Sequence, residues 1–176
     1  MGLSHRAALE RRRHKGDAGL HSPRSRRTSL EAEKVKAFFD SSVLVAAFLA
    51  DHENHEASLA AFAGASVKNG YCAAHSLAEV YAILTRLPVS HRVAGEHALL
   101  FVEEICGRLN LVELTGRQYQ AVITHSARTG IAGGAVYDAL ILQCAVKVRA
   151  ETILTWNLRD FRRIAPDIVS IIRTPG

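Results

Sequence analysis

The chain has 176 residues, of which 48% are hydrophobic and 22% charged, and its formal net charge is +5. This length suits one domain that buries its own core, and the composition excludes wholesale disorder and fibrous proteins. No apolar run approaches the roughly 18 residues of a transmembrane helix, so we expect no membrane-spanning segment. The cysteines Cys72, Cys106 and Cys144 lie more than thirty residues apart, which fits neither a zinc site nor a disulfide framework and indicates a reducing cytoplasm.

The positive charge is concentrated at the start of the chain. Residues 1–36 hold ten Lys or Arg and four Asp or Glu, a net charge of +6, whereas residues 37–176 carry a net charge of −1. Residues 1–34 show almost no apolar periodicity, which predicts a basic, disordered N-terminal extension before a domain at residues 35–176. This extension is either an arm that contacts nucleic-acid phosphates or a solvated tail.

From residue 35 onward, short apolar runs alternate with helical patterns. In chain order the pattern predicts a strand at 35–39, helices at 43–50 and 53–65, a strand at 70–74, helices at 76–87 and 90–109, a strand at 111–114, a helix that ends at the glycines of 130–134, a helix at 136–149, and strands at 152–155 and 168–172. Strands separated by helices predict a parallel sheet covered on both faces, so the expected class is α/β and helix-rich. Functional groups of such sheets lie beyond the carboxyl ends of the strands.

Four acidic side chains of the predicted domain stand alone in stretches without other acids: Asp40, Glu79, Asp138 and Asp160. Asp40 directly follows the first strand, Asp138 lies near the start of an apolar helix, and Asp160 follows the strand at 152–155. An isolated carboxylate in apolar surroundings is costly unless something pairs with it. If the four converge, their repulsion calls for a cation, and carboxylate oxygens favour Mg²⁺ or Mn²⁺ over Zn²⁺. We therefore predict a shared metal site.

Each acid also has a structural interpretation of its own. Glu79 and Ser76 match a capping box, and Asp138 suits the first turn of a helix, where the dipole favours a carboxylate. Asp40 fits an Asx turn after a strand, and Asp160 can pair with a neighbouring arginine. One shared site explains all four acids together, whereas the structural interpretations need four separate reasons.

Four short motifs, in this order, resemble those of PIN-domain nucleases, in particular the VapC-type toxins of bacterial toxin–antitoxin pairs. They are Phe39-Asp40-Ser41-Ser42-Val43, Ser76-Leu77-Ala78-Glu79-Val80, Tyr137-Asp138-Ala139-Leu140-Ile141 and Leu154-Thr155-Trp156-Asn157-Leu158-Arg159-Asp160-Phe161. The resemblance spans residues 36–172. It implies a three-layer α/β/α sandwich, a homodimer, cleavage of RNA with Mg²⁺ or Mn²⁺, and an antitoxin as protein partner.

The resemblance also assigns roles to residues. Asp40, Glu79 and Asp138 fall on the family's three most regular acidic positions, whereas its fourth position, often Asp, is Asn157 here. Asp160 is the expected substitute, so the implied metal ligands are the four acids, with Asn157 as a further catalytic residue. Residues expected to orient carboxylates or water are Ser41, Ser42 and Thr155. Residues expected to bind RNA are Arg86, Arg92, Arg159 and Arg162.

The expected reaction is hydrolysis of an RNA phosphodiester, which leaves 5′-phosphate and 3′-hydroxyl ends. Two alternatives stay open. A haloacid-dehalogenase-like phosphatase also places an aspartate such as Asp40 after its first strand, but it needs an acid two residues later, where this chain has Ser42. A non-catalytic RNA- or protein-binding module would not be stabilised by Mn²⁺.

Overall fold

The computed structural model describes residues 35–88 and 92–176. Five parallel strands form one sheet in the order β3-β2-β1-β4-β5. The strands are β1 (Ala37–Phe39), β2 (Gly70–Ala73), β3 (Asn110–Val112), β4 (Thr152–Leu154) and β5 (Ile172–Arg173). The N-terminal extension predicted at residues 1–34 lies outside the described residues.

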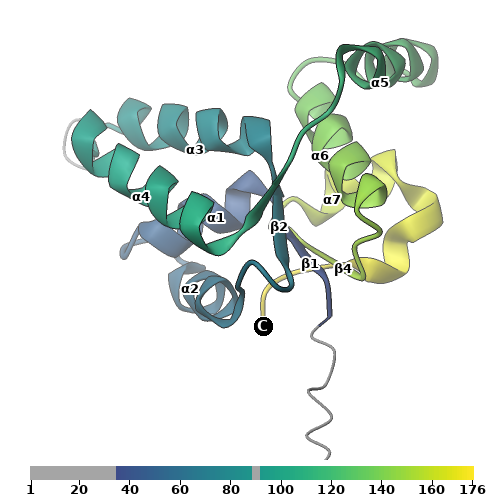
Figure 1. Ribbon diagram of the computed structural model, residues 1–176. Helices are drawn as coiled ribbons and strands as arrows, with labels where there is room; N and C mark the ends of the chain where they lie inside the picture. Colours follow the sequence, from purple (N-terminus) through teal and green to yellow (C-terminus); the bar gives the residue numbers. More distant parts are fainter. Residues whose placement is uncertain (1–34, 89–91) are drawn as a thin grey trace, which may run out of the picture. The chain divides into compact units, whose positions relative to one another are not determined.

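Helices cover both faces of the sheet (Figure 1). They are α1 (Ser41–Phe48), α2 (His55–Gly64), α3 (Ala74–Arg86), α4 (Gly95–Arg108), α5 (Gly116–Thr129), α6 (Ala135–Lys147), α7 (Leu158–Ile164) and the 3-10 segment η1 (Pro166–Ile171). The predicted helix-rich α/β/α sandwich with a parallel sheet is confirmed. Within the described residues, no helix combines the length and apolar character needed to cross a membrane.

The core has two parts because successive side chains of a strand point to opposite faces. On β1, the fully buried Phe39 packs with residues of α1 to α4, whereas its neighbour Phe38 packs with residues of α6, α7 and η1. On β4, Leu154 and Ile153 divide in the same way between the two faces. The central strands are therefore apolar on both faces, as expected for a parallel sheet under two helix layers.

The strand order changes direction between β1 and β4, the position at which α/β sheets have their ligand-binding crevice. The chain leaves β1 toward β2 through α1 and α2 on one face, and it reaches β4 from β3 through α5 and α6 on the other. Neighbouring strands whose connections run to opposite faces open a gap at their carboxyl ends, where α/β proteins bind ligands. Here the backbone amide of Asp40 donates to the carbonyl of Leu154 at 3.0 Å, so the two strand ends are joined beside this gap.

The C-terminal region differs from the sequence prediction. The segment expected as a strand at 168–172 forms η1, and only Ile172 and Arg173 pair with β4. Pro166 at the start of η1 fixes a helical backbone angle, and the apolar side chains that follow pack as a 3-10 turn. The helix α7 was not predicted, and α4 begins at Gly95 rather than at residue 90, with residues 89–91 outside the described chain.

A glycine at the end of α5 gives a test of the backbone. Gly130 has φ of 72°, a left-handed conformation that closes the helix before the segment leading to α6. We expect Gly130→Ala to lower the free energy of unfolding by about 1 kcal/mol, which in a chain of this size lowers the Tm by roughly 2–4 °C. The matched control is Gly107→Ala inside α4, where an added Cβ meets nothing within 4 Å and should stabilise slightly. Equal thermal shifts in the two variants would contradict this assignment.

Candidate active site

Asp40 lies where β1 ends and α1 begins. It is the N-cap of α1, its backbone carbonyl accepts the amide of Val43 at 3.1 Å, and its side chain is only 4% exposed. Two hydroxyl groups donate to its Oδ2 atom, that of Ser42 at 2.5 Å and that of Thr155 at 2.8 Å. Because Thr155 follows β4, the carboxylate is held from both strands that border the crevice.

Glu79 reaches the same region from α3, which starts directly after β2. The hydroxyl of Ser41 donates to its Oε2 atom at 2.5 Å. The imidazole Nε2 of His75, one turn earlier on α3, lies 3.7 Å from the same oxygen. The capping-box interpretation of Glu79 is wrong, because α3 begins at Ala74 and Ser76 lies inside the helix, fully buried.

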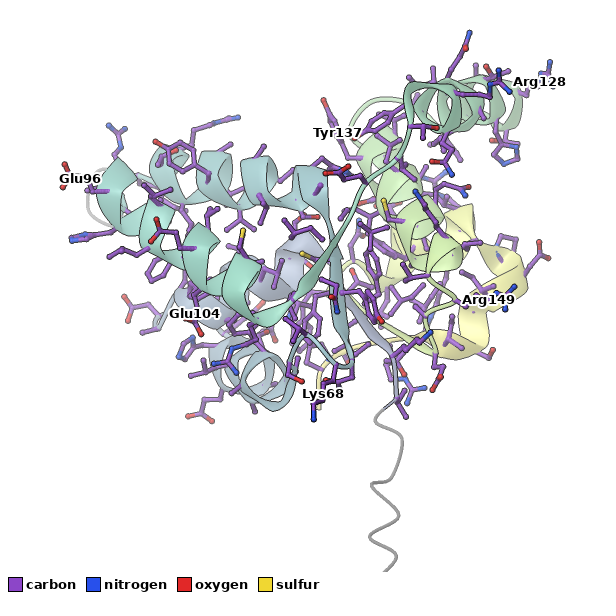
Figure 2. All side chains as sticks on the ribbon, viewed as in Figure 1. Lys68, Glu96, Glu104, Arg128, Tyr137 and Arg149 are labelled. Carbon is purple, nitrogen blue, oxygen red and sulfur yellow. The ribbon has the colours of Figure 1, made fainter. Side chains whose placement is uncertain are left out.

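Asp138 comes from the opposite helix layer. It lies in the first turn of α6. In Figure 2 the label Tyr137 marks this end of the helix, and the label Arg149 marks the residue just beyond its other end. The side-chain amide of Asn157, the N-cap of α7, donates to its Oδ2 atom at 3.0 Å. Asn157 thus holds Asp138 as a neutral hydrogen-bond donor, a role that an ionised aspartate at this position could not fill.

The segment 155–157 connects the two carboxylates. The hydroxyl of Thr155 donates to Asp40 and accepts the backbone amide of Asn157 at 2.9 Å. The hydroxyl of Ser42 likewise donates to Asp40 and accepts the backbone amide of Trp156 at 3.0 Å. Each hydroxyl proton is therefore directed to Asp40, because an N–H group occupies the other side of the oxygen.

Burial raises the pKa of all three carboxyl groups, and neighbouring carboxylates add to the rise for Asp40 and Asp138. Burial raises the pKa of Asp40, and the charge of Glu79 adds to this, although the hydroxyl hydrogen bonds oppose it. Burial also raises the pKa of Glu79, against the hydrogen bond from Ser41. The pKa of Asp138 is raised to about 7, first by burial and then by the charges of Asp40, Asp160 and Glu79. The charges of Asp40 and Glu79 both act on Asp138, so the three acids lie within electrostatic reach of one another and favour protons or a cation between them.

The donor set suits a hard divalent cation. In the part of the chain that the structure describes, no three His, Cys, Asp or Glu side chains stand close enough together to hold an ion as they are. Mg²⁺ and similar ions commonly take only one or two carboxylates and complete their shell with water and substrate phosphates. Buried oxygen donors with raised pKa values fit that mode of binding, because the ion compensates the cost of burying their charge and the repulsion between them.

Asp160 is placed differently from the other acids. The Nη2 atom of Arg163 lies 3.2 Å from its Oδ1 atom, three residues along α7, as its structural interpretation predicted. Its charge contributes to the raised pKa of Asp138, so it lies within electrostatic reach of the site, but its carboxylate is engaged by the arginine. The three residues brought into the hydrogen-bonded cluster are Asp40, Glu79 and Asp138.

The predicted RNA-binding arginines lie in two regions. Arg86 ends α3, and Arg92 follows it with its Nε donating to the carbonyl of Leu87 at 3.4 Å. Arg159 is exposed in the first turn of α7. Arg162 donates to the carbonyl of Ile172 at 3.5 Å, so part of its donor capacity serves the packing of α7 on β5.

One residue of the site, His75, was not predicted as functional. Its spacing of four residues before Glu79 places both side chains on the same face of a helix, which is the signal that could have found it. Burial lowers the pKa of His75, so the imidazole is neutral near pH 7. Within the described residues, its buried Nε2 atom has no hydrogen-bond partner.

Fold and site together define an α/β protein with a carboxylate cluster at the crevice of a parallel sheet, suited to a hard cation and an anionic substrate. Residues 37–166 match the family model of the PIN domain. The chain belongs to the PIN-domain family, and its relatives place it with the VapC-type nucleases.

Two relatives come from Mycobacterium tuberculosis. Ribonuclease VapC40 is 37% identical over 120 residues, which are 68% of this chain and 85% of that protein. Ribonuclease VapC27 is 36% identical over 113 residues, 64% of this chain and 78% of that protein. A crystal structure of VapC20 from the same organism, described as a toxin that cleaves the sarcin–ricin loop, matches with a TM-score of 0.60 and 14% identity over 71% of this chain and 92% of that one. This last likeness concerns the fold alone.

Proposed function

We propose that the protein is a divalent-metal-dependent endoribonuclease and the toxin of a toxin–antitoxin pair. The observation that carries the proposal is the gathering of Asp40, Glu79 and Asp138 near the carboxyl ends of the central strands, where hydroxyl and amide groups of residues 41, 42, 155 and 157 hold them. The PIN-domain match and the naming of the relatives VapC40 and VapC27 as ribonucleases support RNA as the substrate.

Asp40, Glu79 and Asp138 would hold Mg²⁺ or Mn²⁺, some of them directly and the others through water molecules bound to the ion. When bound, the ion would supply an activated water and would neutralise charge that develops on the phosphate. Asn157 adds no charge to this set, and Asp160 is engaged by Arg163, so three carboxylates form the proposed ligand set in place of the four that the sequence indicated.

The remaining polar residues orient these carboxylates. Ser42 and Thr155 fix the rotamer of Asp40, Ser41 fixes that of Glu79, and Asn157 fixes that of Asp138. Fixed rotamers lower the cost of organising the site when RNA and metal arrive. In this proposal, no side chain acts as a covalent nucleophile.

Further parts of the proposal concern partners. Exposed arginines of the two regions described above would contact RNA phosphates, with Arg159 beside Asp160 on α7 and Arg86 at the end of α3. An antitoxin and a second copy of the chain are the proposed protein partners. We place the activity in the cytoplasm, where RNA is found and where the free thiols of Cys72, Cys106 and Cys144 stay reduced.

The phosphatase alternative is not favoured. Its chemistry needs an acid two residues after the strand-terminal aspartate, and Ser42 stands there with its hydroxyl donated to Asp40. The family match over residues 37–166 also assigns the fold to the PIN domain.

The test is cleavage of a mixed panel of structured and single-stranded RNAs with Mn²⁺, with Mg²⁺ and with EDTA. We expect cleavage only with metal, products with 5′-phosphate ends, and a loss of at least about 100-fold in Asp138→Asn. Thermal stability measured with and without Mn²⁺ accompanies the assay and should rise with metal only in the wild type. Equal cleavage by the two proteins, or none by the wild type with metal present, would remove the assignment.

A further inference from the structure

We propose that Trp156 is a positioning residue, which Ser58 anchors and which holds the segment 155–157 in register with the carboxylates Asp40 and Asp138. This inference rests on the proposed function, because the acids it concerns are the proposed metal ligands. Trp156 itself carries no charge and donates no hydrogen bond from its side chain to these acids. Its effect would pass through its neighbours in the chain.

The indole of Trp156 is fixed at a buried point of α2. Its Nε1 atom donates to the hydroxyl of Ser58 at 2.9 Å, and Ser58 is fully buried. The ring itself is partly buried against the core cluster that includes Phe39, Val43 and Phe62. A buried donor and acceptor that satisfy each other are held firmly, because separating them leaves polar groups without partners.

The backbone of the same residue holds the site. The amide of Trp156 donates to the hydroxyl of Ser42 at 3.0 Å, and that hydroxyl donates to Asp40 at 2.5 Å. The residue before it, Thr155, donates to Asp40 at 2.8 Å, and the residue after it, Asn157, donates to Asp138 at 3.0 Å. A displacement of this one peptide segment would therefore disturb both carboxylates together.

This arrangement differs from two common roles of a tryptophan beside such a site, base stacking and packing. An RNA base would stack on an exposed face of the ring, whereas this ring is partly buried against the core cluster and its only polar atom is bound to Ser58. Packing alone would not require that the residues before and after the tryptophan in the chain both donate hydrogen bonds to the proposed metal ligands, as Thr155 and Asn157 do. The hydrogen bond to Ser58 connects α2, which contributes none of the three acids, to the geometry of the site.

The first experiment reads the metal-free protein. Trp156 is the only tryptophan of the chain, so intrinsic fluorescence reports on this position alone. We expect Ser58→Ala to increase acrylamide quenching of the indole in EDTA. Ser58→Thr keeps the hydroxyl and should show quenching at the wild-type level. The matched control is Ser126→Ala on α5, another buried serine in a helix, whose hydroxyl has no partner among the described residues.

The second experiment reads the site. In Ser58→Ala we expect two values to fall by about tenfold, the kcat for RNA cleavage and the affinity for Mn²⁺. This is the lower end of the effect of removing a group that orients a ligand. The Mn²⁺ affinity is titrated by the fluorescence of Trp156. The KM for RNA should stay within twofold, and Ser58→Thr should recover kcat. Ser126→Ala should leave both values unchanged, even if its Tm shifts.

The outcomes separate the inference from the proposed function. A lower Tm in Ser58→Ala with unchanged kcat and unchanged Mn²⁺ affinity would overturn the positioning role while the nuclease assignment stands. A wild type that binds Mn²⁺ but cleaves no RNA would remove the nuclease assignment. In that case the Mn²⁺ titrations and the quenching would decide whether Trp156 positions the carboxylates. Equal quenching in wild type and Ser58→Ala would overturn the anchor itself.

Discussion

Asp40→Asn is expected to lower the rate of RNA cleavage by at least about 100-fold without lowering the stability of the metal-free protein. Residues that only orient a ligand change activity by about 10–100-fold, so loss of the ligand charge itself should cost at least the upper end of that range. Asparagine has the size of aspartate and keeps one carbonyl oxygen that can accept the hydroxyl protons of Ser42 and Thr155.

Stability should move in the opposite direction to activity. Burial raises the pKa of Asp40, which means that its ionised form is costly in the folded protein when no cation is bound. Removing that charge should leave the Tm in EDTA at pH 8 equal to or above that of the wild type. This combination excludes misfolding as the reason for lost activity.

The hydroxyl groups around Asp40 provide graded controls. Ser42→Ala and Thr155→Ala each remove one of the two donors to its Oδ2 atom, and each should lower cleavage by about tenfold. Because both hydroxyls act on one oxygen, their effects should not add in the double variant. Cleavage by Asp40→Asn at the wild-type rate with saturating Mn²⁺ would refute the role of this carboxylate.

The parts of the fold that follow from local pattern could be predicted from the sequence. The apolar run that ends at Phe39 and the polar residues after it mark a strand, its carboxyl end and the start of a helix, which places Asp40 correctly. Asp138 was placed by the apolar stretch that follows it, which is too long for a strand and therefore predicts a buried helix. The parallel sheet and its two helix layers follow from the same alternation.

Other features depend on contacts that the sequence does not reveal. Asp160 resembled the other isolated acids, but an arginine three residues later on the same helix engages it. Ser76 and Glu79 match a capping box in spacing, yet the helix begins two residues before Ser76, so the motif does not apply. The contact between Trp156 and Ser58 joins residues 98 positions apart, and no local pattern indicates it.

Asn157 shows how a departure from a family pattern becomes clear only in three dimensions. From the sequence it is a missing charge at the fourth acidic position. In the structure its amide nitrogen donates to Asp138, whose pKa is already raised by burial and then by three other carboxylates. A fourth carboxylate in its place would add repulsion and remove the donor, so the asparagine suits a site that holds fewer cations.

The metal-free wild type is expected to lose stability as the pH rises from about 4 to about 8, and Asp138→Asn is expected to lose less. The pKa of Asp138 is raised from 3.8 to about 7 in the folded chain. Below pH 3.8 the group is protonated in both states and its contribution is fully present. Between the two values the unfolded chain releases the proton while the folded chain keeps it, so the free energy of unfolding falls until the pH passes about 7.

Asparagine at position 138 does not titrate. The difference in Tm between variant and wild type therefore reports the contribution of Asp138 separately from that of the other acids. In EDTA at pH 8 the variant should melt at least about 2 °C above the wild type, the shift that roughly 1 kcal/mol gives in a chain of this size. At pH 4 the two proteins should melt close together. The measurement is thermal unfolding followed by circular dichroism across this range.

Adding Mn²⁺ at pH 8 should reverse the order. The cation neutralises the carboxylates that are ionised at this pH, so it stabilises the wild type by mass action, whereas the variant has lost a ligand and gains little. A reversal of the two melting temperatures requires that the Asp138 carboxylate destabilise the fold without metal and stabilise it when metal is bound. If Asp138→Asn melted below the wild type in EDTA at pH 8, the carboxyl would be stabilising the fold by itself, and the account of the site as a strained cluster that awaits a cation would be wrong.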